Sequence, residues 1–168
     1  MRGWSLRVGL IAVAVAIALS SQALPAFGQD TDSKDPLVGT WKLNLEKSLV
    51  NRQGVQAHPT RPATRVFAVE GDGYRISFFD GAATTPTRSY FAKFDGKEYP
   101  DPRQAGRGEF GIHNRLSPSM VVREVKANGK PAEWATWSVS SDGNVLTTIG
   151  WDSETPESQN IQVFDRQK

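Results

Sequence analysis

Leu37-Val38-Gly39-Thr40-Trp41-Lys42-Leu43 is the stretch that decides the fold class, because apolar and polar side chains alternate along it. When the stretch is extended to Leu45, one face of the strand carries Trp41, Leu43 and Leu45, and the other face carries Thr40, Lys42 and Asn44. A period of two is typical of a β-strand that is buried on one face only. The chain therefore begins its folded part with a half-buried strand.

Similar short segments recur along the rest of the chain, and turn residues end most of them. Asp-Gly and Asn-Gly pairs are frequent at these ends, and they favour tight hairpins because such turns need positive φ at their central residues. The expected strands are residues 37–45, 63–69, 74–79, 87–94, 97–99, 120–126, 132–139, 145–151 and 159–165, with 113–116 as one further short strand. We interpret residues 48–62 and 100–111 as loops, with a short helix near residues 46–50.

Consecutive antiparallel pairing of these strands predicts an all-β fold. A sheet of about eight to ten strands exposes two edges unless it closes on itself. We therefore predict a single antiparallel up-and-down β-barrel over residues 37–168. A sandwich of two sheets is the structural alternative.

Residues 1–28 have the pattern of a signal peptide. Arg2 and Arg7 form a basic start, residues 8–19 are apolar, and small residues suited to cleavage lie between residues 23 and 29. The apolar run is shorter than the ~20 residues of a membrane-spanning helix. We expect cleavage, a flexible lead-in over residues 29–36, and a secreted or periplasmic protein without stable membrane insertion. A retained N-terminal anchor is the alternative.

Composition excludes several classes of protein. The chain has no cysteine, so it has no disulfide, no thiolate metal site, no thiol nucleophile and no cysteine for lipid attachment. It has 20 basic and 18 acidic residues; Arg2 and Arg7 would leave with the leader, so 18 of each would remain. A neutral chain without a lysine or arginine run is not typical of a nucleic-acid-binding protein. We expect a monomer.

Three segments carry a family resemblance. Residues 35–44, the run Phe94-Asp95-Gly96-Lys97-Glu98-Tyr99-Pro100 and the closing Val163-Phe164-Asp165-Arg166-Gln167 resemble bacterial lipocalin-like exported proteins of the calycin group. The resemblance implies a barrel of the lipocalin or fatty-acid-binding type. In such barrels a first-strand tryptophan packs at the closed end beneath a basic residue of the last strand. By resemblance, Trp41 (with Gly39) and Arg166 take these barrel-closing roles.

The chain also departs from the cytosolic fatty-acid-binding barrels. Those barrels end with an Arg-x-Tyr that grips the ligand carboxylate, whereas the comparable place here reads Gln162-Val163-Phe164. A buried carboxylate without a cationic partner is costly. This departure argues against fatty-acid binding in that mode.

Aromatic and aliphatic side chains on the strands are the candidate ligand-binding residues, since apolar pockets in proteins are lined by such side chains. A barrel interior filled by the same side chains, without a cavity, is the open alternative. Trp134 and Trp137 are three residues apart on one strand and face opposite sides, so only one of them can point inward. The candidates are Tyr74, Ile76, Phe78, Tyr90, Phe94, Trp134 and Trp137.

The charged strand residues Arg75, Arg88, Arg123 and Glu133 are expected to face solvent, as charged side chains usually do. Any of them that faced inward could anchor an anionic or polar ligand. His58 and His113 lie in loop-like sequence without the spacing of a metal site, and we interpret both as surface residues. No metal or cofactor is expected.

These patterns lead to one functional hypothesis and two alternatives. The leading hypothesis is binding of a small hydrophobic ligand inside the barrel without catalysis. The first alternative is a barrel-fold enzyme, an isomerase or lyase, acting on an apolar substrate. The second is an interaction module of the cell envelope that uses the long loops 48–62 or 100–117.

Overall fold

The computed structural model describes residues 35–52, 54–102 and 109–168, and within these ranges all regular structure is β-strand. The predicted signal peptide at residues 1–28 and most of the predicted lead-in lie outside the described residues. The strands are β1 (Gly39–Leu43), β2 (Val50–Arg52), β3 (Val55–Ala57), β4 (Ala63–Glu70), β5 (Gly73–Asp80), β6 (Arg88–Ala92), β7 (Asp95–Pro100), β8 (Glu109–Ser117), β9 (Met120–Ala127), β10 (Lys130–Val139), β11 (Val145–Asp152) and β12 (Asn160–Arg166).

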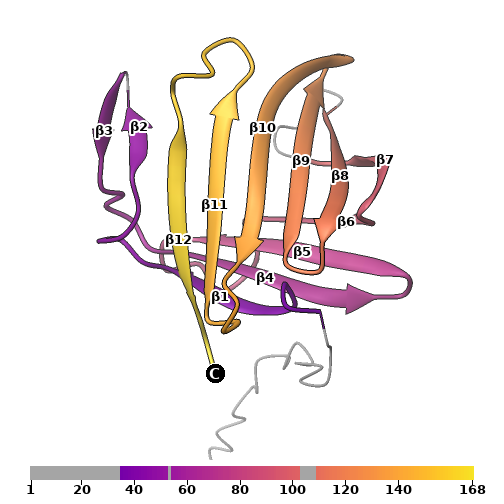
Figure 1. Ribbon diagram of the computed structural model, residues 1–168, viewed down its shortest axis with the longest axis horizontal. Coiled ribbons are helices and arrows are strands. Elements are labelled where there is room, and N and C mark those ends of the chain that lie inside the picture. The colour runs from indigo at the N-terminus through magenta and orange to yellow at the C-terminus, as the bar shows by residue number, and fades with distance from the viewer. Residues whose placement is uncertain (1–34, 53, 103–108) are drawn as a thin grey trace, which may run out of the picture.

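Ten of the strands form one antiparallel sheet in the order β6-β5-β4-β1-β12-β11-β10-β9-β8-β7. β1 pairs with β4 on one side and with β12 on the other, so the first and last strands join the two halves of the sheet. The halves cross each other and enclose a common interior (Figure 1). The predicted all-β, antiparallel barrel is confirmed, and β6 and β7, the two ends of the sheet, leave it nearly closed.

The open seam corrects one expected hairpin. The turn residues Asp95-Gly96 predict a hairpin between residues 87–94 and 97–99, but β6 and β7 are not neighbours in the sheet. Asp95 and Gly96 instead lie inside β7, where the register with β8 shifts between Asp95 and Glu98. Gly96 has φ 77°, so this Asp-Gly pair forms a β-bulge rather than a turn.

At other places the turn residues act as expected. Asn128 and Gly129 join β9 to β10 with φ angles of 52° and 74°. Positive φ at both central residues is the geometry of a type I′ hairpin, which matches the twist of the flanking strands.

The segment expected to be a long loop contains the β2–β3 hairpin, and the expected helix near residues 46–50 is absent. The amide N–H of Lys47 donates to Asn44 Oδ1 at 3.0 Å in a turn, and Leu49 then bridges Ile161 of β12. The N–H of Asn51 donates to Asn160 Oδ1 at 2.7 Å. These contacts hold the chain extended and fix the hairpin beside the start of β12.

β1 and β12 meet at the closed end of the barrel. Arg166 lies opposite Trp41 in the register, with its Cζ 4.0 Å from the ring centroid of the indole. Its guanidinium donates to the carbonyls of Pro36, Val38 and Gly143 at 2.5–2.7 Å. A Cβ on Gly39 would lie 2.5 Å from Arg166 Nη1, and Gly39 has φ 141°. Glycine is therefore required two residues before the tryptophan.

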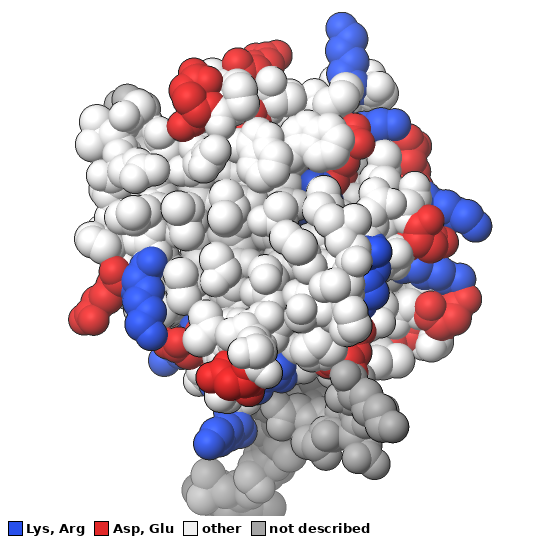
Figure 2. All heavy atoms as spheres, viewed as in Figure 1, with Lys and Arg blue, Asp and Glu red and all other residues white. Residues whose placement is uncertain are grey.

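The outer surface over β10 to β12 carries few charges. Figure 2 shows Lys, Arg, Asp and Glu gathered at the margin of this face, around an uncharged centre. The alternation along these strands explains this surface, because Thr136, Thr147, Ile149 and Val163 point outward while their neighbours point inward. The interior, in contrast, holds several charged side chains.

Candidate ligand-binding cavity

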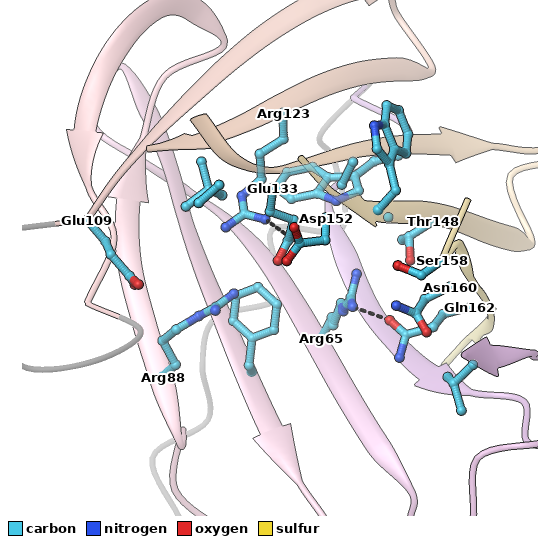
Figure 3. A pocket seen from close by; sticks show the side chains of 18 of the residues that line it. Arg65, Arg88, Glu109, Arg123, Glu133, Thr148, Asp152, Ser158, Asn160 and Gln162 are labelled. Atoms are coloured by element: carbon cyan, nitrogen blue, oxygen red, sulfur yellow. Dashed lines mark hydrogen bonds and ion pairs between the residues drawn. The ribbon is translucent and has the colours of Figure 1, made fainter. Parts of the chain in front are cut away.

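The barrel interior has two parts along its axis. The half near Trp41 is filled by a core cluster that includes Phe67, Ile76, Trp137 and Phe164, all buried. Phe67 and Trp137 meet edge to face with ring centroids 5.2 Å apart. In the other half, residues of β4, β5, β9, β10, β11 and β12 line a cavity of about 940 Å³ that is partly open to solvent (Figure 3). The barrel interior is therefore filled by side chains near Trp41, which we call the floor, and hollow in its other half.

The wall of this cavity mixes apolar and charged side chains. Phe78, Val125, Ala135 and Trp137 contribute apolar surface. Arginine, carboxylate and amide groups come from strands that lie on different sides of the interior (Figure 3). The polar lining residues are Arg65, Asp80, Thr87, Arg88, Glu109, Arg123, Glu133, Thr148, Asp152, Thr155, Ser158, Asn160 and Gln162.

Arg123 is the centre of an ion-pair cluster. It is 3 % exposed, and its Nη2 lies 2.5 Å from Asp101 Oδ2, which is also buried. Its Nη1 lies 2.9 Å from Glu133 Oε1. Burial acts to lower the pKa of Arg123, but attraction from Tyr90, Glu133 and Asp101, together with the Asp101 hydrogen bond, raises it. Arg123 is therefore stably charged and compensated.

Arg88 shares the same carboxylate. Its Nε lies 3.7 Å from Asp101 Oδ1, and its Cζ lies 3.8 Å from the ring centroid of Phe78. A guanidinium over an aromatic face is attracted by the ring quadrupole, more strongly when water is excluded. Its Cζ also lies 5.5 Å from the Tyr90 ring centroid, so the Asp101 carboxylate and two aromatic rings help to hold Arg88 in place.

Arg65 differs from both. Its Nη2 donates to Gln162 Oε1 at 2.5 Å, and its Cζ lies 4.6 Å from the Phe164 ring centroid and 5.3 Å from that of Phe78. Burial, followed by repulsion from Arg88 and Arg123, lowers the pKa of Arg65 to about 9. The surroundings of Arg65 therefore disfavour its positive charge.

His113 corrects the expectation of a surface histidine. It lies on β8, is 0 % exposed, and its Nε2 is 3.3 Å from Tyr90 Oη. The rings of Phe94 and Trp137 lie beside it, with centroids 5.9 Å and 5.2 Å away. His113 belongs to the filled part of the interior, since Tyr90, Phe94 and Trp137, which surround it, lie in or against the core cluster.

The sequence-predicted site residues are divided between the two parts of the interior. Phe78 and Trp137 line the cavity. Four others, Tyr74, Ile76, Tyr90 and Phe94, lie in or against the core cluster at the floor. Trp134 pairs with Glu124 and Trp151 and alternates with buried Ala135, so it lies on the outer side of β10.

Three charged residues expected outside are inside. Arg88, Arg123 and Glu133 line the cavity, whereas Arg75 faces solvent and donates to Glu70. Charged side chains face inward here because they compensate one another. Sequence reasoning missed Arg65 and Gln162. The alternation could have revealed both residues. Arg65 lies two residues from buried Phe67 and Gln162 two residues from buried Phe164, so each shares the inward face of its strand.

Two classes of feature are absent from the described ranges. No group of three or more His, Asp or Glu side chains there could hold a metal ion. Over the same ranges, no helix reaches the length and apolarity needed to cross a lipid bilayer.

Comparison with known proteins identifies the fold. No family model and no curated protein matches the chain. Among solved structures it is similar to the Schistosoma mansoni fatty acid binding protein in complex with arachidonic acid, with 18 % identity, a TM-score of 0.60, and coverage of 79 % of this chain and 97 % of that one. Human cRBP IV gives 19 % identity, a TM-score of 0.54, and coverage of 78 % and 98 %.

The name of a third similar structure mentions no ligand. Secretory abundant heat soluble protein 4 from Ramazzottius varieornatus has 9 % identity, a TM-score of 0.60, and coverage of 81 % of this chain and 98 % of that one. At such identities the likeness concerns the fold alone, which is a calycin-like barrel of the fatty-acid-binding-protein type.

Proposed function

We propose that this protein binds a small, partly apolar molecule in the barrel cavity and releases it chemically unchanged. The observation that carries the proposal is the cavity of about 940 Å³ above an otherwise filled interior. Pockets for small molecules have volumes of this order and combine an apolar wall with a few polar groups. The fatty acid binding protein of similar fold, whose structure contains arachidonic acid, supports the same class of ligand.

The ion pairs in the cavity support binding rather than chemistry. Glu133 is a cavity carboxylate that could serve as a base, but its Oε1 already pairs with Arg123 Nη1 at 2.9 Å. We therefore assign Glu133 to holding Arg123. An isomerase or lyase would require the bound molecule to change its mass or connectivity, and we expect recovered ligand to be unchanged by mass and NMR.

Titration with the uncharged fluorescent probe N-phenyl-1-naphthylamine tests the proposal. We expect the purified protein to bind it with a saturable rise in probe emission and with quenching of tryptophan emission, since Trp137 lines the cavity. Ala135→Leu would fill part of the cavity and weaken binding about tenfold. Thr136→Leu, on the outer side of the same strand, is the matched control and should bind as the wild type does. Equal binding by both variants would contradict a cavity site.

We also propose that the protein is exported, on the support of the basic start, the apolar run and the small residues within residues 1–28. N-terminal sequencing of protein recovered from the periplasm or medium of a bacterial host should give a first residue between 24 and 29. Recovery of the chain in the cytoplasm with Met1 retained would contradict the proposal.

A further inference from the structure

Arg65 lies at the wall of the cavity, between two aromatic rings and one amide. Its guanidinium contacts the faces of Phe164 and Phe78, and Gln162 accepts one of its hydrogen bonds. Figure 3 shows Arg65 and Gln162 side by side on the cavity wall, with Arg88 and Arg123 on other sides of the same space. A guanidinium carries five N–H donors, and one amide oxygen does not occupy them all.

The three cavity arginines are not compensated alike. Arg88 and Arg123 both lie within 4.0 Å of Asp101, and Arg123 also pairs with Glu133. In the described part of the chain, no carboxylate oxygen lies within 4.0 Å of the Arg65 guanidinium. Withdrawing a cation from water without a counter-ion is costly, so partly buried Arg65 lowers the stability of the protein.

The electrostatic surroundings point the same way. Burial and the nearby cations Arg88 and Arg123 lower the pKa of Arg65, more than the attraction of Tyr90 and Glu133 raises it. A guanidinium does not lose its proton in proteins, so the unfavourable energy remains until an anion enters. The acidic residues Asp80 and Asp152 are exposed, and each already accepts a hydrogen bond, from Thr87 Oγ1 and from the N–H of Glu154.

We propose that the cavity selects molecules with a single anionic group, such as a carboxylate or sulfonate, seated against Arg65 and Gln162. The inference rests on the proposed function and adds the charge of the ligand to it. Arg65 is the one cavity arginine for which the described residues supply no carboxylate within 4.0 Å, and a single anionic group on the ligand would supply that partner. The amide N–H groups of Gln162 can donate to the same anion, because its oxygen already accepts from Arg65. The cation of the proposed site, Arg65, lies on β4. The inward positions of the last strand, β12, carry Gln162 and Phe164 and therefore no cation.

Two probes that share one ring system test the inference. 1-Anilinonaphthalene-8-sulfonate carries a sulfonate that N-phenyl-1-naphthylamine lacks. We expect the wild type to bind the sulfonate about tenfold more tightly, as a charge-assisted hydrogen bond would give. Arg65→Gln should remove this preference and leave the affinity for the neutral probe within about twofold. Arg65→Lys should keep part of the preference, because it keeps the charge but loses the planar donor set.

Arg75→Gln is the matched control, because Arg75 is on the neighbouring β5 but faces solvent and pairs with Glu70. It should leave both affinities unchanged. Retained binding of the neutral probe shows that the Arg65→Gln variant is folded. If both probes bind and Arg65→Gln does not weaken the sulfonate, the inference is overturned while the proposed function stands. If neither probe binds the wild type, the proposed function itself fails.

Discussion

At the scale of single residues, Arg166 and Arg65 both lie opposite Trp41 in the sheet register but have opposite roles. Arg166 at the closed end donates to three carbonyls and covers the Trp41 ring, so its donors are matched inside the protein. Arg65 at the cavity wall has one amide and two rings around it. The first arrangement stabilises the fold, and the second retains binding capacity for a ligand.

Gly39 is predicted to be essential for the closed end. In Gly39→Ala the new Cβ would displace Arg166 Nη1 and the backbone would stay at φ 141°. We expect a loss of about 2 kcal/mol in the free energy of unfolding, measured by urea denaturation. Gly150→Ala, whose Cβ would meet only ordinary contacts at 3.6 Å or more, is the control and should be tolerated. A Gly39→Ala variant as stable as the wild type would show that Arg166 does not need this position.

Arg123 and Arg65 are predicted to differ in their contribution to stability. Arg123→Met would leave the buried Asp101 short of its nearest cation, and we expect a loss of about 3 kcal/mol. Arg65→Met removes a cation without stranding a carboxylate, so its unfolding free energy should stay within about 1 kcal/mol of the wild type or rise. The comparison is made by denaturant unfolding without added ligand. Equal losses in the two variants would contradict the assignment of Arg65 as uncompensated.

At the scale of the elements, the hairpins are formed by local chemistry. The β10–β11 turn is an example, since Asp142 accepts from the Ser140 hydroxyl at 2.5 Å and from the N–H of Asn144 at 3.0 Å. These hydrogen bonds lower the pKa of Asp142 from 3.8 to about 2, chiefly through Ser140 and then through Asn144.

This shift predicts a pH-dependent contribution of the turn to stability. Because the folded-state pKa lies below the unfolded value, the contribution is complete above about pH 4 and is lost as the pH falls towards 2. Asp142→Asn should therefore lower the melting temperature at pH 5, and the difference from the wild type should shrink at pH 2. A difference as large at pH 2 as at pH 5 would mean that the carboxylate charge is not responsible.

The same scale shows what the sequence could predict. Ten of the twelve described strands follow from alternation and turn residues, because one face of each is buried and the period is plain. The β2–β3 hairpin could not be predicted, since Val50–Arg52 and Val55–Ala57 are short and are held by Ile161 and Asn160, more than a hundred residues away. Asp95-Gly96 could not be distinguished from a hairpin turn, because a bulge and a turn use the same residue pair.

For the whole molecule, the site was harder to predict than the fold. Alternation tells which side chains share a face, but it does not tell which face is inward when charges compensate one another there. Arg88 and Arg123 can face inward because both pair with the buried carboxylate of Asp101, and Glu133 because it pairs with Arg123. These partners come from separate strands and loops, so the alternation within one strand does not reveal them. The aromatic pattern predicts Tyr74 and Tyr90 at the cavity, yet their positions along β5 and β6 place them in or against the core cluster of the filled half.

NMR of the protein with N-phenyl-1-naphthylamine tests the central claim, a half-filled barrel with a binding cavity, most directly. We predict intermolecular NOEs from the probe to the methyl groups of Val125 and Ala135 and to the Trp137 ring, all at the cavity wall. NOEs confined to exposed Val69 or Leu116, or their absence from every cavity residue under saturating probe, would contradict the claim.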